Sequence, residues 1–242
     1  MTASGAQIFC GPIMGDSGRL YNGLGQSHVE GMRSLVSCAY VAVHNYTEAC
    51  LLTGFPYRGQ GPSREELDDM LQALAAMSAK SAVVTSVSLE GGHCVVDYEN
   101  SGARDASESR RFILPYEEIP VRFPGTGDIF SAALMGWCLR GKSLENASAR
   151  AMSAVRGMIE RNVGSQVSFR GIAVEASLDL LDYDQEEWKG SMLVSKLPQC
   201  SSFPDRPDTT TSRVAGPPCR LPTSFCSSSV DPILTCLRFF IQ

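Results

Sequence analysis

The sequence has no cluster of lysine and arginine residues. It contains 21 Lys and Arg against 26 Asp and Glu, which gives a net charge of −5 at pH 7. Proteins that bind nucleic acids or anionic membrane surfaces normally present a basic patch. The lack of one excludes these two classes of partner and favours small molecules as ligands.

The chain also lacks an uninterrupted apolar run of the roughly 20 residues that a membrane-spanning helix needs. Its beginning, MTASGAQIFC, does not follow the basic and then apolar pattern of a secretory signal. None of the nine cysteines forms a CxxC pair, and the three histidines show no metal-ligand spacing. We therefore expect a soluble cytoplasmic protein without disulfide bonds or a membrane partner.

Composition divides the chain near Lys196. Before this point apolar and charged residues alternate in segments that can fold, whereas the rest is rich in Pro, Ser and Thr and has no periodicity. We expect residues 1–187 to form the C-terminal portion of one α/β domain. Residues 188–242 are expected to form a disordered or poorly packed tail.

Helical and extended patterns alternate along the first 187 residues. We expect strands at 39–43, 81–87 and 109–115, a glycine-turned hairpin across 89–99, and helices at 27–38, 63–77, 128–140 and 144–161. Such alternation predicts a mostly parallel sheet covered by helices on both faces. In sheets of this kind ligands bind beyond the carboxyl ends of the strands.

The stretch PGTGD directly precedes a strongly apolar helix. Gly125 and Gly127 allow a phosphate to approach the backbone N–H groups of the helix start, and Thr126 can add a hydroxyl donor. Asp128 can accept a proton from a substrate hydroxyl that attacks a γ-phosphate. The alternative is a glycine-rich turn in which Asp128 only caps the helix.

The stretch HNYTEACLLTG places Asn45 and Glu48 three positions apart at the start of a short helix. Both side chains then project from one face, where a carboxamide and a carboxylate can hold hydrated Mg²⁺ beside nucleotide phosphates. The alternative is that Asn45 caps the helix and Glu48 only favours its first turn.

Two other stretches carry polar residues at predicted strand ends. In GPIMGDSG, Asp16 can contact metal-bound water or a nucleotide, or it can hydrogen-bond its own backbone in a plain turn. Thr85 and Ser86 can meet a phosphate, or they can satisfy backbone groups at the end of their strand. The chain contains neither a Walker lysine loop nor a dinucleotide GxGxxG motif.

Taken together and in this order, GPIMGDSGRLY, HNYTEACLLTG, SAVVTSV and PGTGDIFSAAL resemble the ribokinase-like superfamily, and within it the pyridoxal (pyridoxine/pyridoxamine) kinases. The resemblance runs from about Ile8 to about Arg161. Sugar kinases of the superfamily usually carry Ala at the position of Thr126, and hydroxymethylpyrimidine kinases usually carry Cys at the position of Asp128. GTGD together with PIMGD therefore looks more like a vitamin B6 kinase.

This resemblance implies a kinase that uses ATP, Mg²⁺ and a monovalent cation to phosphorylate the 5′-hydroxymethyl group of a B6 vitamer. By the same analogy it would be a homodimer. Asp128 would activate the hydroxyl group, and Gly125, Thr126 and Gly127 would form the anion hole for the transferring phosphoryl group. The residues that would contact ATP are Asp16, Asn45, Glu48, Thr85 and Ser86, with Glu48 and Asp16 also holding the metal through water.

The chain departs from the family pattern in two ways. Gly11 stands where the family normally has Asp, so we expect a lower affinity for Mg·ATP. By resemblance, the family also has a segment before the PIMGD loop that supplies the first strands, most of the vitamin pocket and the lid. We therefore expect a ribokinase-like fold that is incomplete at its N-terminal side, with weak or no turnover. The other open functions are a hydroxymethylpyrimidine or sugar kinase and a non-catalytic nucleotide-binding fragment.

Overall fold

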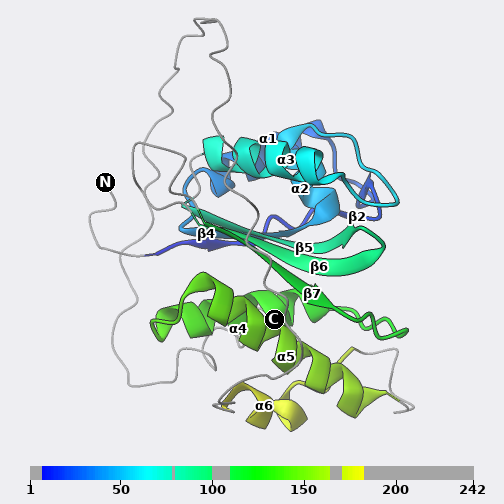
Figure 1. The fold of residues 1–242 in the computed structure, drawn as a ribbon, viewed down its shortest axis with the longest axis vertical. Coiled ribbons are helices and arrows are strands. Elements are labelled where there is room, and N and C mark those ends of the chain that lie inside the picture. Colours follow the sequence, from blue (N-terminus) through cyan, green and yellow to red (C-terminus); the bar gives the residue numbers. More distant parts are fainter. Residues whose placement is uncertain (1–6, 78–79, 100–109, 164–170, 183–242) are drawn as a thin grey trace, which may run out of the picture.

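The structure is a computed structural model that describes residues 7–77, 80–99, 110–163 and 171–182 (Figure 1). The predicted tail at 188–242 lies outside these residues. A five-stranded sheet has the order β1-β4-β5-β6-β7, and β2 and β3 form a separate two-stranded hairpin. The strands are β1 (Phe9–Cys10), β2 (Gly15–Asp16), β3 (Arg19–Leu20), β4 (Val41–Asn45), β5 (Ser81–Leu89), β6 (Gly92–Glu99) and β7 (Arg110–Tyr116).

All strands of the large sheet except β6 point in the same direction. β1 pairs with β4 and β4 pairs with β5 in parallel, whereas β6 is antiparallel to both β5 and β7. This confirms the predicted α/β class with a mostly parallel sheet. The carboxyl ends of β1, β4, β5 and β7 consequently meet at one edge.

Helices cover both faces of the sheet, as predicted: α1, α2 and α3 lie over one face, and α4 and α5 lie over the other (Figure 1). A short 3₁₀ turn, η3, and a last helix, α6, follow α5. Their bounds are α1 (Gln26–Val36), α2 (Tyr46–Thr53), α3 (Arg64–Ala76), α4 (Thr126–Leu139), α5 (Leu144–Asn162), η3 (Glu175–Ser177) and α6 (Asp179–Asp182).

Two apolar clusters hold the helical layers against the sheet. Side chains alternate between the faces of a strand. Ala42 of β4 therefore joins the cluster beneath α1, α2 and α3, while Val41 and Val43 join the one beneath α4 and α5. Because β4 and β5 are buried on both faces, they read as continuous apolar runs in the sequence.

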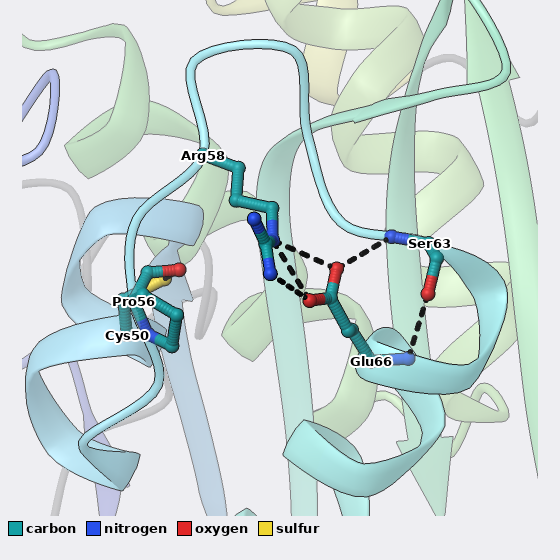
Figure 2. Close-up of polar contacts among 5 residues, drawn as sticks. All are labelled: Cys50, Pro56, Arg58, Ser63 and Glu66. Atoms are coloured by element: carbon teal, nitrogen blue, oxygen red, sulfur yellow. Dashed lines mark hydrogen bonds and ion pairs between the residues drawn. The ribbon is translucent and has the colours of Figure 1, made fainter.

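A capping box starts α3, the helix predicted at 63–77. The Ser63 Oγ accepts the Glu66 N–H (3.1 Å), and the Glu66 carboxylate accepts the Ser63 N–H (3.0 Å) (Figure 2). Arg58, from the loop after α2, pairs with the same carboxylate. A single carboxylate therefore joins the start of α3 to the preceding loop.

Several predicted boundaries differ from the observed ones. The strand predicted at 39–43 is β4 at 41–45, because Ala39 and Tyr40 belong to the turn after α1 although they are apolar. The strand predicted at 81–87 continues to Leu89, with an irregularity between Val84 and Val87. The hairpin formed by β2 and β3 was not predicted, since four residues carry no period-2 pattern.

Within the described residues, no helix has both the length and the apolar character that crossing a membrane requires. The cysteines of this part of the chain are all free thiols: Cys10, Cys38, Cys50, Cys94 and Cys138.

Candidate active site

The sequence motifs meet at the carboxyl edge of the sheet. The segment from Gly11 to Ser17, which includes β2, follows β1, and Asn45 is the last residue of β4. The segment after β7 leads into the PGTGD stretch and α4. This is the edge at which open α/β sheets bind their ligands.

The start of α4 leaves its backbone donors open. Gly125 is the N-cap in the left-handed conformation (φ 85°, ψ 0°), and no side chain caps the helix. The first N–H that bonds back is that of Ile129, which donates to the Gly125 carbonyl (3.0 Å). The three N–H groups before it have no intrahelical acceptor by geometry, and the helix dipole adds partial positive charge. This arrangement suits an anion.

Gly127 contributes space rather than packing. A Cβ built there meets nothing within 4 Å in the described structure, so packing does not demand glycine at this position. Gly125 differs, because its φ of 85° falls in the region that only glycine adopts without strain. The open space beside Gly127 leaves room for a ligand against the helix start.

Asp128 lies in the first turn of α4, between the open N–H groups and the buried Ile129 and Phe130. The two apolar side chains fix the rotation of the helix, so the carboxylate stays at the sheet edge. Burial raises the pKa of Asp128 above its ordinary value. A carboxylate with a raised pKa is a better proton acceptor.

Asn45 and Glu48 form a reciprocal cap at the start of α2. The Asn45 Oδ1 accepts the Glu48 N–H (2.9 Å), and the Glu48 Oε2 accepts the Asn45 N–H (2.9 Å). The pair also holds the loop after β1: the Met14 N–H donates to Glu48 Oε1 (3.0 Å), and the Asn45 Nδ2 donates to the Gly15 carbonyl (2.9 Å). The predicted alternative of a helix cap is therefore realised, and the cap also fixes the neighbouring loop.

The environment of Glu48 limits how it can serve a metal ion. Burial raises its pKa, while N–H groups of Asn45, Met14 and Gly15 lower it. Both carboxylate oxygens accept backbone N–H groups, so a cation would reach them through water. Within the described residues, no group of three or more His, Cys, Asp and Glu side chains can hold a metal. The residues present thus fit an ion that keeps most of its waters and takes few protein ligands, as Mg²⁺ does.

Asp16 lies on the β2–β3 hairpin and keeps a partly exposed side chain. Its Oδ1 accepts the N–H of Ser17 (2.7 Å), which is the local turn contact given as the alternative for this residue. Its Oδ2 pairs with the guanidinium group of Arg122, which lies 106 positions away in the segment before α4. This ion pair joins the hairpin to the entrance of the α4 helix.

Tyr21 shows that the carboxylates converge. Its pKa is raised, first by burial and then by the charges of Asp16, Glu48 and Asp128, while Arg122 lowers it. One phenol on the loop after β3 thus lies within electrostatic reach of carboxylates from the hairpin, α2 and α4. Neither Tyr21 nor Arg122 was predicted from the sequence, although Tyr21 lies in GPIMGDSGRLY and Arg122 is two positions before PGTGDIFSAAL.

Thr85 and Ser86 are consecutive residues of β5, but their surroundings differ. Thr85 is in register with Asn45 on the neighbouring strand and so lies beside the site. Ser86 is exposed and has φ 58° at the irregularity of β5. Burial raises the pKa of Tyr116 on β7, and the Ser86 side chain lowers it in part.

A cavity of about 370 Å³ lies between the segment after β7 and the C-terminal half of α5. Ile119, Pro120 and Val163 give it apolar walls, and Arg156 with three glutamates gives it charged ones. Its walls include residues only a few positions before the PGTGD stretch. The lining residues are Glu117, Glu118, Ile119, Pro120, Arg156, Glu160 and Val163.

Comparison with known proteins identifies a family that the chain matches. A family model described as phosphomethylpyrimidine kinase matches residues 9–170. A pyridoxal kinase of Arabidopsis thaliana is 28% identical over 155 residues, which cover 64% of this chain and 48% of that protein. The chain spans about half the length of the curated relatives it matches.

Solved structures agree with the fold. A candidate phosphomethylpyrimidine kinase from Bacteroides thetaiotaomicron, in a crystal form with pyridoxal, is 30% identical with a TM-score of 0.67, over 75% of this chain and 63% of that one. Pyridoxal kinase from Leishmania donovani in complex with ADP is 25% identical with a TM-score of 0.64, over 80% of this chain and 63% of that one. The described architecture is therefore that of these kinases.

Proposed function

The chain belongs to the phosphomethylpyrimidine kinase family, and from this premise we propose that it forms the nucleotide-binding and catalytic part of an ATP-dependent pyridoxal kinase. One observation carries the proposal. The open N–H groups of α4 and the Asp128 carboxylate lie at the same helix start, at the carboxyl edge of the sheet. One helix start thus combines an anion-binding site for the transferring phosphoryl group with a base.

In the proposed reaction, the hydroxymethyl oxygen of the vitamer attacks the γ-phosphorus of ATP. Asp128 accepts the hydroxyl proton, while the bond between the γ-phosphorus and the bridging oxygen breaks and ADP leaves with the electron pair. The N–H groups of Thr126 and Gly127 stabilise the charge on the transferring oxygens. Donors preorganised in this way typically contribute about 10²–10³ in rate each.

The other predicted residues have supporting tasks in this proposal. Asn45 and Glu48 fix the loop after β1 and so keep Asp16 at the site. Mg²⁺, when bound, neutralises phosphate charge, and Asp16 and Glu48 are the carboxylates that would hold its waters. The position of Thr85 beside Asn45 supports its predicted contact with the nucleotide. A monovalent cation, a homodimer and a cytoplasmic location stay predictions.

The choice of a B6 vitamer rests on the curated relatives, which are pyridoxal kinases, and on Asp128, where hydroxymethylpyrimidine kinases by resemblance carry Cys. The description of the family model supports the second candidate, a hydroxymethylpyrimidine kinase. A panel of pyridoxal, pyridoxine, pyridoxamine and hydroxymethylpyrimidine with ATP separates the two.

The test uses the purified chain and its Asp128→Asn variant. Nucleotide binding is measured at equilibrium with a fluorescent ADP analogue, and turnover is followed as formation of pyridoxal 5′-phosphate. We expect both proteins to bind nucleotide and any turnover to disappear in the variant. Failure of the folded wild-type chain to bind nucleotide would contradict the proposal. Turnover that survives in the variant would remove Asp128 from its role.

A further inference from the structure

Arg122 lies in the segment before α4 and forms an ion pair with the β2–β3 hairpin. Its guanidinium group pairs with Asp16, while 83% of its side chain remains exposed. Exposed ion pairs contribute little to stability, so a stabilising effect on the fold does not account for this pair. The pair does hold the positive charge of Arg122 between the hairpin and the start of α4.

The charged groups around Arg122 are mostly negative. Of the four side chains whose charges shift the pKa of Tyr21, three are the carboxylates of Asp16, Glu48 and Asp128, and Arg122 is the cation. A nucleoside triphosphate would add several negative charges beside these three carboxylates. The sequence has no Walker lysine loop to offset them. A cationic side chain close to α4 would reduce this repulsion, and Arg122 is such a side chain.

We propose that Arg122 is a phosphate-binding residue of this site, which Asp16 positions over the start of α4 and which contacts the terminal phosphates of the nucleotide. The inference rests on the proposed function, since it assumes that a nucleotide binds there. It assigns Asp16 a positioning role in addition to its predicted contact with metal-bound water.

The chemistry of the guanidinium group supports this assignment. It carries five N–H donors in a rigid fork, and the Asp16 contact uses one edge. Donors remain for a phosphate, which arginine binds in a bidentate manner. Arg122 is also only three positions before Gly125, so its backbone lies close to the anion-binding turn along the chain.

The experiment compares Arg122→Gln and Arg122→Lys with Arg19→Gln. Arg19 is an exposed arginine of the same hairpin and is in register with Asp16, so its loss changes the net charge equally. The equilibrium affinities for ATP and for AMP are measured for each folded protein, at several salt concentrations. AMP reports contacts other than those to the terminal phosphates.

We expect Arg122→Gln to weaken ATP binding about 10- to 100-fold, the effect of one charged hydrogen-bonding group, and to leave AMP binding unchanged. Arg122→Lys should recover part of the loss, and Arg19→Gln should bind ATP as the wild type does. Equal losses in the two glutamine variants, or an unchanged Arg122→Gln, would overturn the inference and leave the proposed function intact. A wild-type chain that binds neither nucleotide would instead overturn the proposed function and this inference with it.

Discussion

Asn45 and Glu48 satisfy each other's backbone N–H groups across the first turn of α2, at distances of 2.9 Å in both directions. Ser63 and Glu66 make the same reciprocal contacts at the start of α3 (Figure 2). Only the first of these two capping boxes also holds the loop after β1, through Met14 and Gly15. The chain thus contains a functional candidate and a structural counterpart with the same local chemistry.

The two boxes allow the structural and functional contributions to be separated. We expect Asn45→Ala and Ser63→Ala each to lower the free energy of unfolding by about 1 kcal/mol, the usual effect of losing an N-cap. Only Asn45→Ala should also weaken nucleotide binding, because it releases the loop that carries Asp16. Urea unfolding and nucleotide titration measure the two effects. If Ser63→Ala weakened nucleotide binding equally, the Asn45 box would have no special function.

Gly127 should be required for binding but not for folding. Because its Cβ position is open, Gly127→Ala should leave stability unchanged or raise it by up to about 1 kcal/mol, as replacement of a helical glycine does. The added methyl group occupies the space beside the open N–H groups, so nucleotide affinity should fall at least about tenfold, the loss of one neutral hydrogen bond.

The matched control for this variant is Gly31→Ala on α1, where a Cβ also meets nothing within 4 Å. It should change stability in the same direction and leave nucleotide affinity as it is. Both variants are compared by thermal unfolding and by nucleotide titration. An unchanged affinity in Gly127→Ala would show that no phosphate approaches this turn.

Gly11 is the position where the family pattern has a carboxylate, and the structure has room for one. A Cβ there meets only the Val43 carbonyl at 3.8 Å, and the backbone is not in the left-handed region. We expect Gly11→Asp to fold normally and to bind nucleotide more tightly in the presence of Mg²⁺ than in its absence. Titrations with ATP, with and without Mg²⁺, measure this difference. A weaker affinity under both conditions would mean that the added charge only repels the phosphates.

The fold could largely be predicted because its signals are local. The apolar runs of β4 and β5, the capping box at Ser63 and the glycine turn before β6 each specify an element within a few residues. The exact strand limits depend on pairing partners that are distant in the sequence, which is why β4 begins at Val41 rather than Ala39.

The candidate site could be predicted only in part, for the same physical reason. Asp128 and the glycines around it belong to one short motif whose geometry follows from a helix start. The ion pair of Arg122 with Asp16 joins segments far apart in the sequence. A lone arginine carries no pattern that indicates its partner, so this relationship required the three-dimensional structure.

Asp97 of β6 is a buried carboxyl group outside the candidate site, and its burial should affect stability. It is fully buried and accepts a hydrogen bond from Ser148 (3.0 Å), while its Oδ2 has no hydrogen-bond partner among the described residues. Burial raises its pKa well above the ordinary value, and the bond from Ser148 lowers it only in part. We therefore expect Asp97→Asn to raise the free energy of unfolding at pH 7, by about 1–3 kcal/mol, because folding no longer has to keep protonated a carboxyl group that ionises in the unfolded chain.

The sign follows from proton linkage. Between the unfolded and the folded pKa of Asp97, the folded state keeps a proton that the unfolded state releases, so stability falls as pH rises through this range. The gain from Asp97→Asn should accordingly be small at acidic pH and grow toward neutrality. Nucleotide affinity should stay as it is, because Asp97 faces α5 rather than the site. Unfolding curves at several pH values test this, and a gain that did not grow with pH would contradict it.

Asp128 should show the same linkage at the site, where the bound nucleotide offers a second readout. Burial raises its pKa, so the unbound chain should lose stability relative to Asp128→Asn as pH rises from the unfolded pKa through the folded one. Phosphates bound at the start of α4 bring negative charge close to this carboxyl group and should raise its pKa further. Nucleotide should therefore move the pH range of the stability difference upward. Unfolding of both proteins across pH, with and without a non-hydrolysable ATP analogue, measures this. A range that the analogue left unchanged would mean that the terminal phosphate binds away from the start of α4, and Asp128 could not then be the base for the hydroxyl group that attacks it.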